Sequence, residues 1–305
     1  MDATTPTSRQ QADTAPGRSL FVSAPDGLQL HVRAYGPRTA PALPVVCLPG
    51  LARTAADFED LACAMAESPS GPRAVYALDY RGRGRSGYDH DPANYNFPVE
   101  LADLMAVLTA LDIGRAVFVG TSRGGLLTML LAAARPGVIA GAVLNDIGPV
   151  IEPKGLARIK GYVGKLPQPT SYADAATLLR RLFDAQFPAL GDDDWRAFAH
   201  RTFDERDGRL MPNYDPRLAE TLRSVDIEQP LPALWKEFDA LAAVPVMVIR
   251  GANSDILSPA TVKAMRTHHP GLKAIEVPDQ GHTPLLTGPL NGRIEAFVVS
   301  CEAAD

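Results

Sequence analysis

Short apolar runs alternate with amphipathic segments along most of the chain. Near its start, alternating positions in Leu20–Ser23 and Leu28–Tyr35 flank the turn-forming residues 25–27, which predicts a β-hairpin. Four apolar runs then have the length and composition of buried strands: Val45–Leu48, Ala74–Leu78, Ala116–Val119 and Ile139–Leu144. The helices expected between them are Ala55–Ala66, Val99–Leu111 and Ser122–Ala134. This alternation predicts βαβ units and a parallel sheet.

The alternation stops after Asn145 and resumes at Val246. The stretch between them carries helical patterns and no clear buried strand, the candidates being Tyr172–Phe183, Asp193–Phe203, Arg217–Val225 and Pro232–Leu241. Strand and helix patterns then return at Val246–Ile249, Pro259–Thr267, Ala274–Val277 and Pro284–Val299. We therefore expect an α/β core made of residues 19–149 and 243–302, with a helical cap inserted at 150–242. Residues 1–18, rich in Ser, Thr, Pro, Ala and Gln, predict a disordered tail.

Composition narrows the class of protein. With 30 basic and 35 acidic residues and a net charge of -5, the chain has no basic stripe, so a nucleic acid partner is not expected. The three cysteines are widely spaced, which predicts neither a disulfide framework nor a zinc site. The N-terminus lacks the apolar region of a secretory signal, and no apolar run is long enough to cross a bilayer. We expect a soluble, cytoplasmic monomer or homodimer.

One segment carries the strongest chemical signal. The buried run ending at Val119 leads into Gly120-Thr121-Ser122-Arg123-Gly124 and then into an apolar helix. This strand, tight turn and helix form the setting that a Gly-x-Ser-x-Gly nucleophile requires, because the glycines keep side chains away from a strained serine. The serine hydroxyl would then lie at a helix N-terminus, where developing negative charge is favoured. Ser122 is the predicted nucleophile.

These features resemble the α/β-hydrolase superfamily, specifically esterase-like members with a helical cap. The resemblance covers about Leu20 to Val299, almost the whole chain. It implies a mostly parallel eight-stranded sheet with helices on both faces and an inserted helical cap. It also implies a catalytic triad in the chain order serine, acid, histidine.

His282 matches the family's catalytic histidine. It follows Gly281 in a loop between the last predicted strand and the last helix. An imidazole can take the serine proton and return it to the leaving group. The other histidines, at 31, 90, 200, 268 and 269, lack this setting.

The acid has two candidates. Asp255 follows the buried run Val246–Ile249, where the family usually keeps this residue, and is the preferred choice. Asp146 follows an earlier strand, from which some members take their acid. Either carboxylate would accept the second N–H of the histidine and stabilise the imidazolium.

The oxyanion hole is expected at two backbone amides. One belongs to Arg123, the residue after the nucleophile, and the other to Leu51, in the loop after Val45–Leu48. The family usually has His-Gly in that loop, whereas this chain has Pro49-Gly50. Because the donor is a backbone amide, the departure need not matter. The side chains of Arg53 and Arg123 flank these loops and are candidates to meet a substrate carboxylate.

The expected activity is hydrolysis of small carboxylic esters by a serine hydrolase, through an acyl-enzyme and without a metal or organic cofactor. Carbon–carbon cleavage of diketones, lactone opening, perhydrolysis and acyl transfer use the same residues and stay open. A ligand-binding receptor that keeps a slow triad is the alternative of another class. Aromatic side chains of the inserted segment are mostly expected in its core, with a few lining the substrate pocket.

Overall fold

The computed structural model describes residues 16–223, 226, 229 and 231–302. Most of the tail predicted at residues 1–18 lies outside this part. Within it, the predicted hairpin is present: β1 (Arg18–Ser23) pairs antiparallel with β2 (Gln29–Tyr35). Gly27 adopts a positive φ of 86° in the turn between them, a conformation that glycine adopts without strain.

An eight-stranded sheet forms the centre of the molecule, in the order β1-β2-β4-β3-β5-β6-β9-β10. The pairs β1–β2 and β2–β4 are antiparallel, and all other neighbouring strands pair in parallel. The predicted mostly parallel sheet is therefore confirmed. Its remaining strands are β3 (Val45–Leu48), β4 (Val75–Asp79), β5 (Ala116–Thr121), β6 (Ile139–Asn145), β9 (Val246–Gly251) and β10 (Lys273–Val277).

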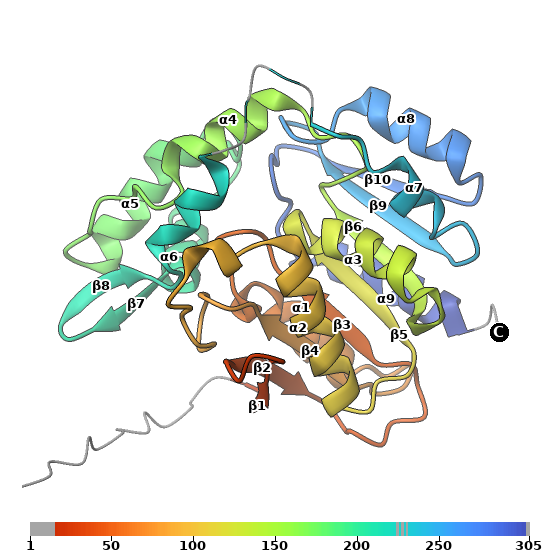
Figure 1. Cartoon of the computed structure of the whole chain (residues 1–305). Helices are drawn as coiled ribbons and strands as arrows, with labels where there is room; N and C mark the ends of the chain where they lie inside the picture. The colour runs from red at the N-terminus through yellow and green to blue at the C-terminus, as the bar shows by residue number, and fades with distance from the viewer. Residues whose placement is uncertain (1–15, 224–225, 227–228, 230, 303–305) are drawn as a thin grey trace, which may run out of the picture.

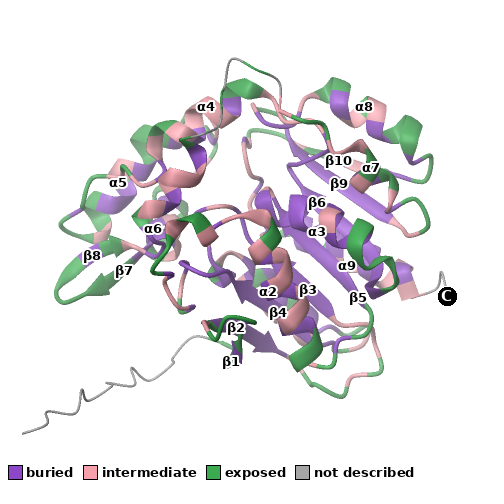
Figure 2. Cartoon of the chain, viewed as in Figure 1, coloured by how far each residue is buried: buried purple, intermediate pink, exposed green. Residues whose placement is uncertain are grey.

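Helices cover both faces of this sheet, and Figure 2 shows its central strands as buried. Side chains of α1 (Glu59–Ala66) and α9 (Pro289–Glu302) pack into one apolar core. Side chains of α2 (Phe97–Ala110), α3 (Arg123–Ala134) and α8 (Pro259–His268) pack into the core on the other face. Parallel strands covered on both sides explain why the sequence shows continuous apolar runs rather than alternation.

The inserted segment forms a third group of elements beside the sheet (Figure 1). Its helices α5 (Tyr172–Phe183) and α6 (Asp192–Thr202) enclose a separate apolar cluster that contains Trp195 and Phe203. Sequence patterns did not predict the helix α4 (Pro153–Tyr162) or the exposed hairpin of β7 (Phe203–Arg206) and β8 (Arg209–Pro212). The short helix α7 (Trp235–Asp239) packs against α3 of the core. Short 3-10 helices complete the fold at η1 (Ala55–Phe58), η2 (Pro92–Asn94), η3 (Pro136–Val138) and η4 (Pro216–Leu222).

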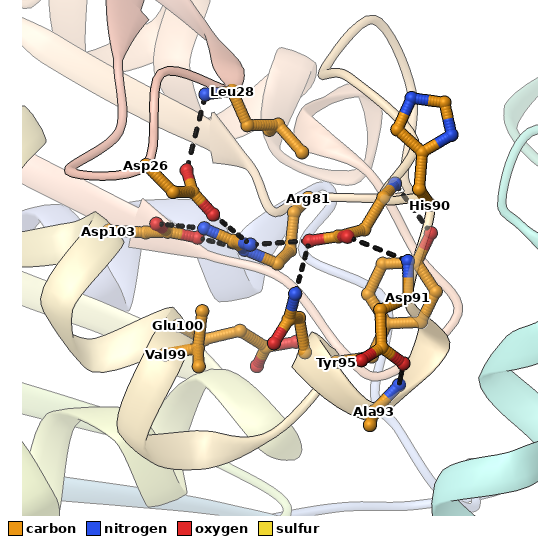
Figure 3. A network of polar contacts seen from close by, with 12 residues as sticks. Asp26, Leu28, Arg81, His90, Asp91, Ala93, Tyr95, Val99, Glu100 and Asp103 are labelled. Carbon is orange, nitrogen blue, oxygen red and sulfur yellow. Dashed lines mark hydrogen bonds and ion pairs between the residues drawn. The ribbon is translucent and has the colours of Figure 1, made fainter.

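The arginine-rich loop after β4 is held by ion pairs of the buried Arg81. Figure 3 shows the Arg81 guanidinium in contact with both Asp26 and Asp103, and Arg81 also donates to Asp89 at 2.6 Å. Arg81 is only 1% exposed, so its charge needs these partners. The loop thereby fixes the β1–β2 turn against α2.

No helix within the described residues is both long enough and apolar enough to span a membrane.

Candidate active site

Ser122 lies in the sharp turn between β5 and α3. Its φ of 51° and ψ of -112° lie outside the regions that L-residues usually adopt. A Cβ at Gly120 would lie 2.5 Å from the backbone of Gly124, and one at Gly124 would lie 2.0 Å from the carbonyl oxygen of Leu48. The two glycines are thus required by close backbone packing, as the sequence pattern implies.

The hydroxyl of Ser122 meets the imidazole of His282. The distance from Ser122 Oγ to His282 Nε2 is 2.8 Å, although 160 positions separate the two residues in the chain. His282 lies in the loop between β10 and α9, at the end of the sheet where β5 also ends. The hydroxyl can donate to this nitrogen directly, without a bridging water.

The carboxylate that contacts the histidine is Asp146. His282 Nδ1 lies 2.8 Å from Asp146 Oδ2, and the other oxygen accepts from the backbone N–H of Gly251 at 2.8 Å. Asp146 follows β6, which pairs in parallel with β9. The backbone of Asp146 has a positive φ of 56°. Its side chain is fully buried, so the carboxylate is oriented by protein donors alone.

Asp255, the preferred acid in the sequence analysis, is not at this position, and that prediction is wrong. Its oxygens accept two hydrogen bonds from Arg158 of α4, at 2.7 and 2.8 Å. Burial would raise the pKa of this carboxyl, but the Arg158 guanidinium outweighs burial and lowers the pKa. The turn after β9 directs Ser254 toward Asp146 and Asp255 toward the inserted segment.

The two residues expected to supply the oxyanion hole are joined by a buried ion cluster. The Nε of Arg83 donates to the carbonyl of Leu51 at 2.8 Å, and its Nη1 donates to Glu100 at 2.8 Å. The other oxygen of Glu100 accepts from Arg123 Nε at 2.6 Å. Within the described residues, the backbone N–H groups of Leu51 and Arg123 donate to no protein acceptor. Both amides are therefore available to a bound oxyanion.

The arginines suggested as carboxylate-binding groups are already paired. Arg53 donates to both oxygens of Asp57 and, at 2.7 Å, to the hydroxyl of Thr202. Arg123 is paired with Glu100 and stacks on Phe97, with its guanidinium carbon 4.0 Å from the ring centroid. Neither side chain is an open anion site.

Sequence reasoning missed two side chains that hold the histidine loop. Asn145 Nδ2 donates to Thr121 Oγ1 at 3.2 Å and to the carbonyl of Pro284 at 3.0 Å, which ties the turn before Ser122 to the loop after His282. Gln186, which follows α5, accepts a hydrogen bond from the backbone N–H of His282 at 2.9 Å. No local pattern marks either residue, because the contacts with the histidine loop span 139 positions for Asn145 and 96 for Gln186.

Two cavities meet at Ser122, and both are also lined by Leu51 and Ile159. The first runs beneath α5 and α6 and is lined partly by aromatic side chains, namely Tyr162, Phe183, Phe187, Phe198 and Tyr214. The second is more apolar and runs between η2 and α4, along Phe97, Leu126, Ile147, Leu156 and Ile256. A few aromatics of the inserted segment thus line the pocket, while Trp195 and Phe203 are buried in its core. No group of three or more His, Cys, Asp or Glu side chains in the described part is arranged to hold a metal.

Comparison with known proteins extends these observations. A model of the alpha/beta hydrolase family matches residues 45–290. The 3-hydroxybutyrate-oligomer hydrolase of Cupriavidus necator is 33% identical, over 90% of this chain and 95% of that protein. The sn-1-specific diacylglycerol lipase of Mus musculus is 28% identical, over 81% of this chain and 76% of that protein.

Solved structures show the same relationship. An alpha/beta hydrolase from Novosphingobium aromaticivorans is 39% identical and has a TM-score of 0.84, with 95% of this chain and 99% of that chain covered. The family model spans far more than half of this chain, and the strands from β3 to β10 of the sheet lie within the matched residues. The chain is therefore a hydrolase that belongs to the alpha/beta hydrolase family.

Proposed function

We propose that this protein hydrolyses carboxylic esters through an acyl-enzyme on Ser122, and that its substrates are oligoesters of short hydroxy acids. The observation that carries the mechanism is the continuous path of two 2.8 Å contacts from Ser122 Oγ through His282 to Asp146. A hydroxyl, an imidazole and a buried carboxylate in this order are the groups that serine-based acyl transfer requires.

In the proposed reaction, Ser122 attacks the ester carbonyl while His282 Nε2 takes its proton. The amides of Leu51 and Arg123 stabilise the oxyanion, and Asp146 stabilises the imidazolium. His282 then protonates the leaving alcohol. A water molecule, deprotonated by the same nitrogen, attacks the acyl-enzyme and releases the acid.

Two observations support oligoesters as the substrate class. The cavities extend in two directions from Ser122, so an ester with a sizeable chain on each side of the scissile bond can be accommodated. The relative from Cupriavidus necator, named for hydrolysis of 3-hydroxybutyrate oligomers, is similar along almost its full length. In such oligoesters, the alcohol part and the acyl part on either side of the scissile bond are of comparable size.

The test is a substrate panel assayed with the wild type and with Ser122→Ala as the blank. It contains linear 3-hydroxybutyrate dimer, trimer and tetramer, p-nitrophenyl acetate and butyrate, a lactone and a β-diketone. We expect multiple turnovers on the oligomers, with kcat/KM rising from dimer to trimer. A single stoichiometric burst would indicate a receptor, and turnover confined to the lactone or diketone would contradict oligoester hydrolysis.

A further inference from the structure

The acid of the proposed relay has a third donor that the mechanism above does not use. Ser254 Oγ lies 2.5 Å from Asp146 Oδ2, the same oxygen that faces His282 Nδ1. Ser254 lies in the turn after β9, one residue before Asp255. This turn therefore contributes a hydroxyl to the site at the place where the family usually contributes a carboxylate.

The direction of this hydrogen bond is determined by its surroundings. Ser254 Oγ accepts from the backbone N–H groups of Ile256 at 3.2 Å and Leu257 at 3.1 Å. With its lone pairs occupied, the hydroxyl can only direct its proton toward the carboxylate. The turn itself is fixed, because the Ser254 N–H donates to the Gly251 carbonyl at 3.0 Å and a Cβ at Gly251 would meet the Gln280 carbonyl at 2.4 Å.

We infer that Ser254 is a positioning residue of this site, whose hydroxyl sets the pH at which His282 gains its proton. The inference rests on the proposed function only for its kinetic consequence. A donor on Asp146 Oδ2 withdraws charge from the oxygen that stabilises the imidazolium. Ser254 thus favours the neutral imidazole, which is the form that can act as a base.

Other charged groups near His282 also influence the pH at which it gains its proton. Asp255 faces it from the turn after β9, with its charge offset by Arg158 of α4. Across the first cavity lie the Arg53–Asp57 pair, Asp60 and Arg201. None of these groups hydrogen-bonds to Asp146, so the direct contact between position 254 and the His282–Asp146 pair is the hydrogen bond to that carboxylate.

The experiment compares Ser254→Ala with Ser254→Thr, which keeps the hydroxyl, and with Ser258→Ala. Ser258 is the matched control, because its hydroxyl caps α8 on the same loop without touching Asp146. Two readouts are used: the acid limb of the pH profile of kcat/KM, and the titration of the residue 282 imidazole by NMR. The NMR titration is run in the Ser122→Ala background, with His282→Gln to assign the signal.

We expect Ser254→Ala to move both midpoints up by about 0.5–1 pH unit. Ser254→Thr and Ser258→Ala should leave them at the wild-type position. Unchanged midpoints in Ser254→Ala would overturn the inference, even if activity or stability fell. If Ser254→Ala does not fold, a wild-type midpoint in Ser254→Cys, whose thiol is a weaker donor, would overturn it equally. The NMR result is independent of turnover, so it separates this inference from the proposed function.

Discussion

Arg158 binds Asp255 through two parallel hydrogen bonds, from Nε at 2.7 Å and from Nη2 at 2.8 Å. The backbone supports the same contact, since the N–H of Gly155 donates to the carbonyl of Asp255 at 2.9 Å. These bonds join the first helix of the inserted segment to the turn after β9. Asp255 therefore anchors the insertion on the core, and Asp146 is left to contact the histidine.

The two carboxylates should respond differently to removal of their charge. Asp146→Asn should lower kcat by about 10³–10⁴-fold, because an amide at that position favours the wrong imidazole tautomer. Asp255→Asn should keep kcat within about threefold of the wild type, since Asp255 is paired with Arg158 and does not hydrogen-bond to His282. Steady-state kinetics on p-nitrophenyl butyrate measures both. A larger loss in Asp255→Asn than in Asp146→Asn would restore Asp255 as the acid.

This pair also shows where sequence reasoning reached its limit. The nucleophile turn could be predicted because Gly120, Ser122 and Gly124 are local in the chain and their spacing is required by sterics. The position of His282 could be predicted because a loop after the last strand must end at the same edge of the sheet as β5. Both acidic candidates satisfied that rule, since β6 and β9 are neighbours.

What distinguishes the two acids is a residue that local patterns do not reveal. Arg158 lies in α4, a helix that was not predicted, and it reaches Asp255 across 97 positions. The hairpin of β7 and β8 was missed for a related reason, because most of its side chains are exposed and give no apolar run. Long-range pairing and surface strands leave little trace in the order of residues.

Gln186 should affect the chemical step more than substrate binding. Its side chain accepts from the backbone N–H of His282, so Gln186→Ala removes one hydrogen bond that positions the base. We expect kcat to fall about fivefold with KM nearly unchanged, the size that one hydrogen bond contributes. Gln168→Ala, at an exposed position of the same segment, is the control. A rise in KM at constant kcat would assign Gln186 to the pocket instead.

Glu100 should determine both stability and its dependence on pH. Burial would raise the pKa of Glu100, but Arg123 and Arg83 outweigh it and hold the pKa below its ordinary value of 4.5. Because the pKa of Glu100 is lowered in the folded state, its ion pairs with Arg83 and Arg123 stabilise the fold fully above pH 4.5. This contribution is lost as the pH falls through the pKa of Glu100 in the folded state. Glu100→Gln should therefore cost about 3–5 kcal/mol at pH 7, because two buried arginines lose their shared partner.

Chemical denaturation from pH 3 to pH 7 measures this effect. The free energy of unfolding should decrease less steeply below pH 4.5 in Glu100→Gln than in the wild type. Asp192→Asn, which breaks an exposed ion pair with Arg180, should change little at any pH. If the free energy of unfolding changed with pH in parallel for Glu100→Gln and the wild type, the ion pairs of Glu100 would not be the source of the pH dependence.

The two cavities should each hold one side of an oligoester. Leu166→Trp would fill part of the first cavity and Leu156→Trp part of the second; both leucines are only partly buried, so the larger ring can be accommodated. Each change should lower kcat/KM for the 3-hydroxybutyrate trimer by about tenfold, the effect of one to two kcal/mol of lost contact, while p-nitrophenyl acetate is cleaved as before. Equal losses on the trimer and the acetate would mean that the changes disturb the site itself.

Loss of one hydroxyl tests the central claim most directly. The rate of 3-hydroxybutyrate trimer hydrolysis is measured for the wild type and for Ser122→Ala at equal concentration, with circular dichroism to establish that both are folded. The account predicts that kcat falls by about 10⁶-fold, to the limit of detection, because no other group can form the acyl-enzyme. Turnover by Ser122→Ala within tenfold of the wild type would contradict it.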